Sequence, residues 1–367
     1  MQNLSSGTCF VLPNGALGGA EFIQLSLIKK IKQQQPDHTI YVIFLTSCFT
    51  ENWVPILDEL QISYRCISKC RSLKTALIQS IPALIQYIKE FHVEQVFSSQ
   101  VFINLLLCFL KRTKLLNQKV IVRESTQVLK RVSGYKKKLV EYLYRFYSSA
   151  TYIIVQTDTM RLSLLKHING SETWNMHVLY NPIDLNEMDS KAEQNTHSYS
   201  LPQPCYVAAG RFIPEKGFDL LIQAFAFIPE PYHLVIFGEG PERNKCMNWI
   251  LENELEHRIH LPGHTNNPLP YFKQAYATVL SSRLEGFPNT LLQMMSQCGC
   301  VLATHCTDEV QNLPGVLTAQ PNSVEALQKI LQQALLQKQT LRDENLVRQR
   351  TYLKTAHSFE PYLSLIS

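Results

Sequence analysis

The chain has 367 residues and a mass of 42.1 kDa, more than one hydrophobic core usually supports, so two domains are expected. Hydrophobic residues make up 45% and charged residues 18%, with a mean hydropathy of -0.09, which excludes a disordered or collagen-like chain. The formal net charge is +5, and because no run of 18 uncharged apolar residues occurs, the sequence predicts no membrane-spanning helix.

The positive charge is concentrated in the first half, where residues 1–200 hold 22 Lys and Arg residues against 15 Asp and Glu residues. Basic residues are densest at Lys111, Arg112, Lys114, Lys119, Lys130, Arg131, Lys136, Lys137, Lys138 and Arg145. Such a density suits anionic lipid or polyphosphate, and it also suits an ordinary solvated face. The first residues lack the features of a signal peptide, so we expect a cytoplasmic protein, with peripheral attachment to the inner face of the cell membrane left open.

Short apolar runs alternate with amphipathic stretches along the first half, the pattern of repeated strand and helix units around a parallel sheet. The predicted strands are Cys9–Leu12, Ile40–Leu45, Ser63–Ile67, Gln95–Ser98, Val120–Arg123 and Tyr152–Gln156. The predicted helices include Ala20–Gln34, Ser72–Phe91 and Tyr135–Ser148.

A polar segment with Pro202 and Pro204 then interrupts the alternation, which predicts a linker over 186–204. Further strands are predicted at Cys205–Ala209, Leu234–Phe237, Arg258–Leu261, Thr278–Ser281, Cys300–Ala303 and Val316–Leu317. Further helices are predicted at Gly217–Phe227, Glu242–Glu252, Pro288–Gln297 and Ser323–Leu341. The sequence therefore predicts an α/β protein with two Rossmann-like, doubly wound domains, 1–185 and 205–354, facing across a cleft that suits a small ligand.

Two motifs place glycines between a strand and a helix. In LPNGALGGAEF, residues 12–22, Gly18 and Gly19 allow backbone amides at a helix N-terminus to face an anion, although a tight turn alone would also explain them. In AAGRFIPEKGFDLL, residues 208–221, Arg211 and Lys216 lie on a loop that opens a helix. A guanidinium fork and a mobile ammonium are suitable for binding a diphosphate, so we favour this role over ordinary surface charges.

Two further motifs follow strands of the second domain. In FGEGPERNKC, residues 237–246, Gly238 and Gly240 permit close approach of a base or ribose, or simply a strand-to-helix turn. In SSRLEGFPNTLLQ, residues 281–293, Pro288 begins a helix whose first amides can hold a phosphate. Glu285 precedes that helix and can accept hydrogen bonds from sugar hydroxyls.

These blocks together resemble the retaining glycosyltransferases of family 4, which have the GT-B fold. They occur in the family's order and cover most of the chain: LGGAE, IVRES at 121–125, IVQTDTM at 154–160, LYNPID at 179–184, GRFIPEKGFDLLIQAFA, FGEGPER, LPGHTNNPLPYF and SSRLEGFPNTLLQMM.

The resemblance implies that Arg211 and Lys216 bind the donor diphosphate and that Glu285 contacts the transferred sugar, which makes these three the expected catalytic residues. Donor contacts are also implied for Gly18, Gly19, Gly238, Glu239, Phe287, Pro288, Asn289, Thr290 and Gln293. Residues from about 355 to 367 look like the family's last helix, which crosses back to the first domain. Arg123 and Glu124 are candidates for acceptor contacts, or form a salt bridge beside their strand.

The sequence departs from the family in two places. The family has a second Glu eight residues after the first, holding the nucleotide ribose, and here that position is Gln293. A neutral amide loses the charge assistance of a carboxylate, about 1–2 kcal/mol. The segment 304–316 looks short and altered, so no donor contact is carried over to it.

No metal or cofactor is expected, because the sequence has no Asp-x-Asp, no P-loop motif and no His or Cys pattern at zinc spacing. We interpret the chain as a metal-independent retaining glycosyltransferase that moves a sugar from a nucleotide diphosphate, a UDP-sugar, to a glycan or lipid-linked acceptor in cell-surface polysaccharide synthesis (lipopolysaccharide or capsule). No nucleic-acid partner is expected. A non-catalytic sugar-nucleotide or glycan-binding subunit of the same fold is the alternative. A dinucleotide oxidoreductase is disfavoured, since the glycine spacing differs from that fingerprint.

Overall fold

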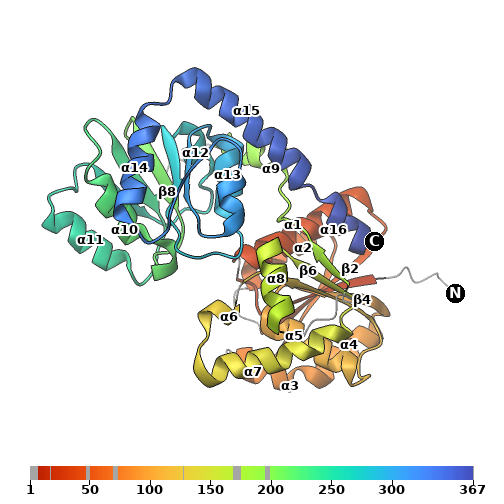
Figure 1. The fold of residues 1–367 in the computed structure, drawn as a ribbon. Helices are drawn as coiled ribbons and strands as arrows, with labels where there is room; N and C mark the ends of the chain where they lie inside the picture. Colours follow the sequence, from red (N-terminus) through yellow and green to blue (C-terminus); the bar gives the residue numbers. More distant parts are fainter. Residues whose placement is uncertain are drawn as a thin grey trace. The chain divides into compact units, whose positions relative to one another are not determined.

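The computed structural model describes residues 7–16, 18–46, 50–68, 73–126, 128–167, 175–194 and 199–366. The chain divides into two compact units, the first formed by residues 1–182 and 359–367 and the second by residues 183–358 (Figure 1). Each unit is a parallel β-sheet with helices on both faces.

The first unit contains a seven-stranded sheet in the order β3-β2-β1-β4-β5-β6-β7, with every neighbouring pair parallel. Its strands are β1 (Gly7–Leu12), β2 (Thr39–Thr46), β3 (Ser63–Ser68), β4 (Val93–Ser98), β5 (Lys119–Glu124), β6 (Tyr152–Val155) and β7 (Met176–Val178). Its helices are α1 (Gly19–Gln34), α2 (Val54–Glu59), α3 (Leu73–Gln79), α4 (Ile81–Glu90), α5 (Val101–Arg112), α6 (Val128–Arg131), α7 (Gly134–Tyr144), α8 (Asp158–His167) and α16 (Glu360–Ile366), with short 3-10 turns η1 (Thr50–Asn52) and η2 (Arg145–Ser149).

Alternate residues of β1 enter two separate cores, as expected for a strand covered on both faces. Cys9 and Val11 pack with residues of α4, α5 and α7. Phe10 and Leu12 pack on the other face with residues of α1, α2 and α16. The helix α16, which follows the second unit in the sequence, is thus part of the first unit's core.

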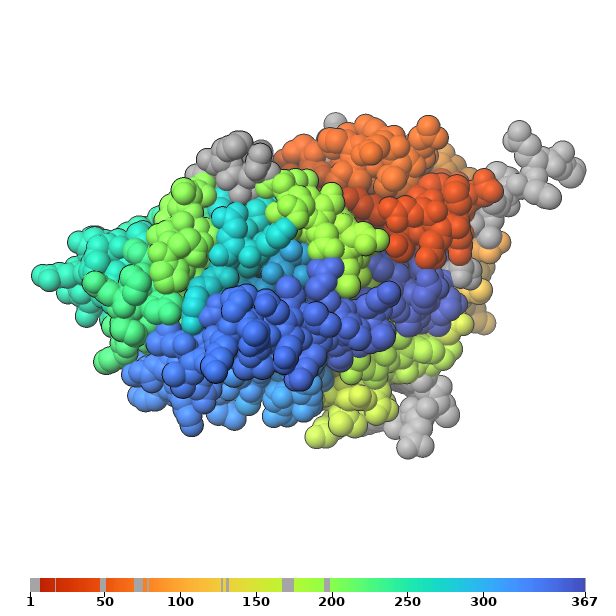
Figure 2. All heavy atoms as spheres, turned by 90° about the horizontal axis from the view of Figure 1, so that it is seen from above, coloured from red at the N-terminus to blue at the C-terminus, as the bar shows by residue number. Residues whose placement is uncertain are grey.

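The second unit contains a six-stranded parallel sheet in the order β10-β9-β8-β11-β12-β13. Its strands are β8 (Cys205–Ala209), β9 (His233–Phe237), β10 (Ile259–Gly263), β11 (Ala277–Leu280), β12 (Val301–Thr304) and β13 (Val316–Ala319). Its helices are α9 (Leu185–Ala192), α10 (Phe218–Phe225), α11 (Arg243–Glu252), α12 (Leu269–Gln274), α13 (Asn289–Gln297), α14 (Val324–Leu335) and α15 (Gln339–Ala356), with 3-10 turns η3 (Pro214–Lys216) and η4 (Asp308–Asn312). Figure 2 shows α15 (blue) lying along the visible surface of this unit.

The structure differs from the sequence prediction at three helices. Where a linker was expected over 186–204, α9 forms, because Asp184 caps it by accepting hydrogen bonds from the N–H groups of Asn186 and Glu187 and because Asp189 pairs with Arg350 at 2.7 Å.

The predicted helix Ser72–Phe91 is two helices, and Pro82 lies in the first turn of the second one. The predicted helix Ser323–Leu341 ends at Leu335, and α15 begins at Gln339. No proline or glycine lies between these two helices in the sequence. The helical periodicity of the apolar residues therefore predicted one continuous helix there.

Within the part of the chain that the structure describes, no helix combines the length and the apolar character needed to cross a bilayer. Seven of the eight described cysteines are buried and have free thiols, and Cys66 is exposed. Burial raises the pKa of the seven buried thiols, that of Cys246 to about 11 and that of Cys205 to about 12.

Candidate functional site

The candidate site in the second unit lies at the carboxyl ends of β8 and β11. These two strands are neighbours in the sheet, and the chain leaves them in opposite directions, toward β9 and toward β12. In parallel α/β sheets, ligands bind outside the strand ends at such a reversal. The loops that follow β8, β9 and β11 carry the three sequence motifs predicted for this domain.

Two glycines allow these loops to pack closely. Gly238, after β9, has φ +147°, and a Cβ atom there would lie 1.8 Å from the carbonyl oxygen of Gly210. Gly217, before α10, has φ +63°, and a Cβ atom there would lie 2.3 Å from the carbonyl oxygen of Ser281. Neither position could hold a side chain without moving the backbone. These two glycines therefore allow the loop after β8 to pack closely against the loops after β9 and β11.

Lys216 and Glu285 form an ion pair at this sheet edge. The Lys216 Nζ atom donates to Glu285 Oε1 at 2.6 Å, and each side chain is only 16% exposed. Ser282 Oγ donates to the same carboxylate oxygen at 3.0 Å, and the Glu285 N–H donates to the Cys306 carbonyl at 3.2 Å. The structure thus brings together two residues that are 69 positions apart and that the sequence had assigned to one ligand.

Arg211 is exposed on the loop after β8. It has no ion pair with any residue that the structure describes, in contrast to Arg283, which holds Asp219 through two bonds of 2.9 and 2.7 Å. The Arg283 guanidinium lowers the pKa of Asp219 against the opposing effect of burial. Arg283 therefore connects the loop after β11 to the start of α10 through Asp219, whereas the charge of Arg211 remains available to solvent.

The loop after β11 leads into α13. Pro288 occupies the N-cap position and no side chain caps this end. The first turn of a helix leaves N–H groups without intrahelical partners and carries a partial positive charge, so the backbone of Asn289 and Thr290 suits an anion. Phe287 is buried, with its ring 5.6 Å from that of His357.

Gln293 lies one turn further along α13. Its side chain is half-buried, whereas its neighbours Leu292 and Met294 are buried in the core. It therefore lies on the face of α13 that the core leaves accessible. Glu239, after β9, is more open, with its side chain 58% exposed and its carboxylate 3.6 Å from Arg243.

The first unit has an equivalent sheet edge. Its order reverses between β1 and β4, and the loop after β1 contains Gly18 and Gly19, both exposed at the start of α1. Glu21, in the first turn of α1, accepts a hydrogen bond of 2.5 Å from Gln100, which follows β4. The prediction that Gly18 and Gly19 contact the donor stays a prediction.

The two acceptor-side candidates have different surroundings. Arg123 is 0% exposed; its Nε atom donates to the Tyr362 hydroxyl at 3.2 Å and its guanidinium also donates to Asn181. The contact with Tyr362 attaches α16 to β5, and because both contacts hold the buried guanidinium, Arg123 cannot reach an acceptor in this conformation. The expected alternative of a salt bridge with Glu124 is also absent among the ion pairs of the described residues.

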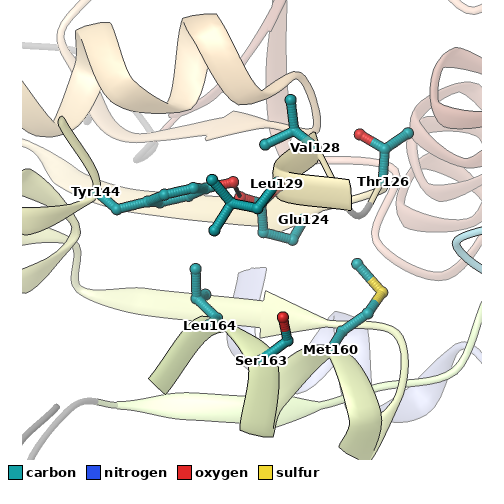
Figure 3. Close-up of a pocket in the computed structure, with 8 residues that line it drawn as sticks. All are labelled: Glu124, Thr126, Val128, Leu129, Tyr144, Met160, Ser163 and Leu164. Carbon is teal, nitrogen blue, oxygen red and sulfur yellow. Dashed lines mark hydrogen bonds between the residues drawn. The ribbon is translucent and has the colours of Figure 1, made fainter. Parts of the chain in front are cut away.

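Glu124 instead faces a small pocket (Figure 3). Its Oε1 atom accepts hydrogen bonds from the Tyr144 hydroxyl at 2.6 Å and the Tyr147 hydroxyl at 2.9 Å. Its Oε2 atom is buried and has no hydrogen-bond partner among the described residues. The pocket has a volume of about 30 Å³ and is lined by Glu124, Thr126, Val128, Leu129, Tyr144, Met160, Ser163 and Leu164.

Burial dominates the acidity of Glu124. Desolvation raises its pKa to about 7, in spite of the two tyrosine hydrogen bonds and the nearby Arg123, which lower it. The pocket is large enough for a water molecule or a single hydroxyl group and too small for a sugar ring.

The residues that position Glu285 were not predicted from the sequence. Ser282 belongs to the quoted motif, and its spacing of three residues from Glu285 could have indicated the contact. The Cys306 carbonyl comes from a distant strand end, which only the fold brings near. Among the described residues, no group of three or more His, Cys, Asp and Glu side chains is placed to hold a metal ion.

Residues 190–350 match the family model of glycosyl transferases group 1. A stretch of 131 residues is 34% identical to the N-acetylgalactosamine-N,N'-diacetylbacillosaminyl-diphospho-undecaprenol 4-alpha-N-acetylgalactosaminyltransferase of Campylobacter jejuni, covering 36% of this chain and 34% of that protein. A stretch of 101 residues is 30% identical to the lipopolysaccharide core biosynthesis glycosyltransferase LpsE of Rhizobium meliloti, covering 28% of this chain and 29% of that protein.

A solved structure of Anabaena HepE in complex with UDP superposes with a TM-score of 0.80 and 14% identity, covering 98% of each chain. The WaaG glycosyltransferase, involved in lipopolysaccharide biosynthesis, gives a TM-score of 0.73 with 16% identity and covers 98% of this chain and 99% of that one. The curated sequence relatives named above are matched over only about a third of their length.

Two parallel α/β units with this strand order and these structural neighbours define the GT-B fold. Within that class, residues 190–350 are similar to the group 1 glycosyltransferases, and the curated relatives named above are glycosyltransferases.

Proposed function

We propose that the chain transfers a sugar from a UDP-sugar donor, with retention of anomeric configuration, to a glycan or lipid-linked acceptor in bacterial cell-surface polysaccharide synthesis. The observation that carries the proposal is the partly buried Lys216–Glu285 pair beside the start of α13. It combines a cation for phosphate, a carboxylate for sugar hydroxyls and a helix N-terminus in one place. The UDP donor is supported by the UDP in the HepE structure.

The proposed chemistry breaks the bond between the sugar C1 atom and the diphosphate oxygen and forms a bond from C1 to the acceptor oxygen. Negative charge on the diphosphate grows as that bond breaks. Arg211, Lys216 and the first amides of α13 stabilise this charge most strongly in the transition state. As the family resemblance implies, the leaving phosphate takes the acceptor proton, so the chemistry requires no protein base and no metal.

The acceptor class rests on the relatives. The Campylobacter relative is named for a diphospho-undecaprenol substrate and LpsE for lipopolysaccharide core synthesis. A lipid-linked acceptor would be met at a membrane surface, so we infer a peripheral location on the inner face of the cell membrane. A non-catalytic binding subunit is not favoured, since the named sequence relatives are transferases.

Turnover of purified protein with a panel of nucleotide sugars tests the proposal. We expect Arg211→Ala and Lys216→Ala each to lower turnover by about 10²-fold or more, because each cation meets charge that grows in the transition state. The matched control is Lys245→Ala, which removes a 75% exposed lysine of the same unit. Turnover should be unchanged in EDTA.

Wild-type turnover in both the Arg211 and Lys216 variants would contradict the assignment of the donor site. Binding of a nucleotide sugar without transfer or hydrolysis in any acceptor mixture would instead identify a binding subunit.

A further inference from the structure

The helix α7 exposes an apolar stripe to solvent. Tyr135, Leu139 and Tyr142 are 76%, 53% and 53% exposed. Their spacing of four and three residues places them on one face of the helix, which we call the α7 face. The opposite face is already used, since Val140 and Tyr144 are buried in the first unit's core. The α7 face therefore contributes nothing to that core, although it exposes large apolar groups.

Basic side chains flank the α7 face. Lys136 and Lys138 are exposed, and the Arg145 guanidinium lies 3.6 Å from the centre of the Tyr142 ring. By helical geometry, Lys136 lies on one side of the stripe and Lys138 and Arg145 lie on the other. The lysine cluster that the sequence left open between a lipid surface and a solvated face thus surrounds exposed aromatic and aliphatic groups.

Further exposed apolar side chains lie on α5. Phe109 is 40% exposed, and its ring contacts Phe146, just beyond α7, at 5.3 Å between centroids. Phe102 is 49% exposed and lies seven residues before Phe109, on the same side of α5. In Figure 1, α7 runs along the outer side of the first unit, in the helical layer that also contains α5.

We propose that the α7 face docks on an anionic lipid bilayer. Aromatic and aliphatic side chains insert at the boundary between headgroups and acyl chains, and flanking lysines attract anionic lipid headgroups. Neither apolar insertion nor charge attraction alone suffices for stable membrane binding, and α7 supplies both on one helix. The proposal deepens the proposed function, because a lipid-linked acceptor lies at such a surface.

The positive charge around the α7 face favours an anionic bilayer over a second copy of the chain as the partner of this face. Residues 101–150 contain eleven Lys and Arg residues and two acidic residues, Glu124 and Glu141, of which Glu124 is buried. Pairing two α7 faces would bring these positive charges together, whereas an anionic bilayer complements them. The exposed leucine and aromatic rings favour a surface with an apolar layer over a purely charged partner.

Flotation of the full chain with vesicles tests the proposal, using equal phosphatidylglycerol and phosphatidylcholine or phosphatidylcholine alone. We expect binding to the anionic vesicles that weakens when salt rises from 0.1 to 0.5 M. The variant Tyr135→Ser/Leu139→Ser/Tyr142→Ser should lower the affinity at least about tenfold, as should Lys136→Gln/Lys138→Gln.

Matched controls change equally exposed residues of the second unit. Phe227→Ser/Leu336→Ser/Val347→Ser removes three side chains that are 62%, 83% and 66% exposed, and Lys329→Gln/Lys354→Gln removes two exposed lysines. Both controls should bind vesicles like wild type. Circular dichroism and thermal unfolding verify that every variant is folded.

The proposal would be overturned if the wild-type chain did not bind anionic vesicles, or if the α7 variants and their controls lost affinity for the vesicles equally. It would also be overturned if only the lysine variant lost affinity, because that result indicates attraction by charge without insertion. A dimer in ultracentrifugation that the α7 variant abolishes, without vesicle binding, would identify a second copy instead. Because vesicle binding needs no turnover, its failure is distinguishable from failure of the proposed transferase activity.

Discussion

Replacing Glu124 by Gln should make the first unit less sensitive to pH. Folding raises the pKa of Glu124 from 4.5 to about 7, so the folded state favours the protonated carboxyl. Wild-type stability therefore falls as pH rises from 4.5 to 7, where the unfolded chain loses this proton first, and changes no further above 7. Gln keeps the shape and an oxygen that can accept from Tyr144 and Tyr147 and has no proton to lose.

The magnitude follows from the two pKa values. A separation of about 2.5 units corresponds to about 3 kcal/mol in full, of which roughly 2 to 3 kcal/mol develops between pH 5 and pH 8. We expect the free energy of unfolding of Glu124→Gln, relative to wild type, to increase by that amount over this interval. Histidines and other titrating groups are common to both proteins, so they cancel in the comparison.

Urea unfolding at pH 5 and pH 8 measures this difference, followed by the fluorescence of Trp53, which is fully buried in the same unit. Glu141→Gln, on the partly exposed side of α7, is the control and should show no such change with pH. A difference between wild type and Glu124→Gln that is the same at both pH values would refute the reasoning, because Glu124 would then carry the same charge in the folded and in the unfolded chain over this range.

The remaining predictions concern the donor site. Gln293→Glu should tighten UDP binding by about tenfold, ~1.4 kcal/mol, in calorimetry, since a carboxylate accepts two ribose hydroxyl protons; weaker binding would mean that the pocket has adapted to a neutral group. Glu285→Gln should raise the affinity for UDP, because Lys216 no longer has an internal anion, while lowering turnover; unchanged UDP affinity would show that the 2.6 Å pair does not compete with phosphate. Gly238→Ala should lower the free energy of unfolding by about 2–4 kcal/mol, since its Cβ would lie 1.8 Å from a carbonyl oxygen, and a melting temperature equal to that of wild type would contradict the close packing of these loops.

Local patterns predicted much of the fold. The apolar strands were recognised because β1 and β8 are buried on both faces and read as continuous apolar runs, and Cys205–Ala209 was predicted with its observed bounds. Helix limits were less predictable where no cap, proline or glycine marks them, as between α14 and α15. The helix α9 was missed because polar residues dominate it, and its stability comes from the Asp184 cap and the Asp189–Arg350 pair.

The candidate site was predictable in part, because its residues lie in local motifs, whereas the contacts between them depend on the fold. Lys216 and Glu285 each lie in a motif with characteristic glycine and proline neighbours, but their 2.6 Å contact depends on β8 and β11 being adjacent. Arg123 illustrates the opposite case. Its position at a strand end suggested a ligand contact, whereas residues far away in the chain, Asn181 and Tyr362, surround it and bury its guanidinium. Sequence spacing alone does not reveal such partners.

The place of α16 in the core of the first unit has a consequence for biosynthesis. Tyr362, Leu363 and Ile366 complete the core that Phe10 and Leu12 begin, yet a ribosome must synthesise residues 183–358 between those two groups. The second unit is continuous in sequence and can fold as it emerges, whereas the first unit exposes part of that apolar face until α16 arrives. During this interval the nascent first unit exposes apolar surface, although its strands are made first.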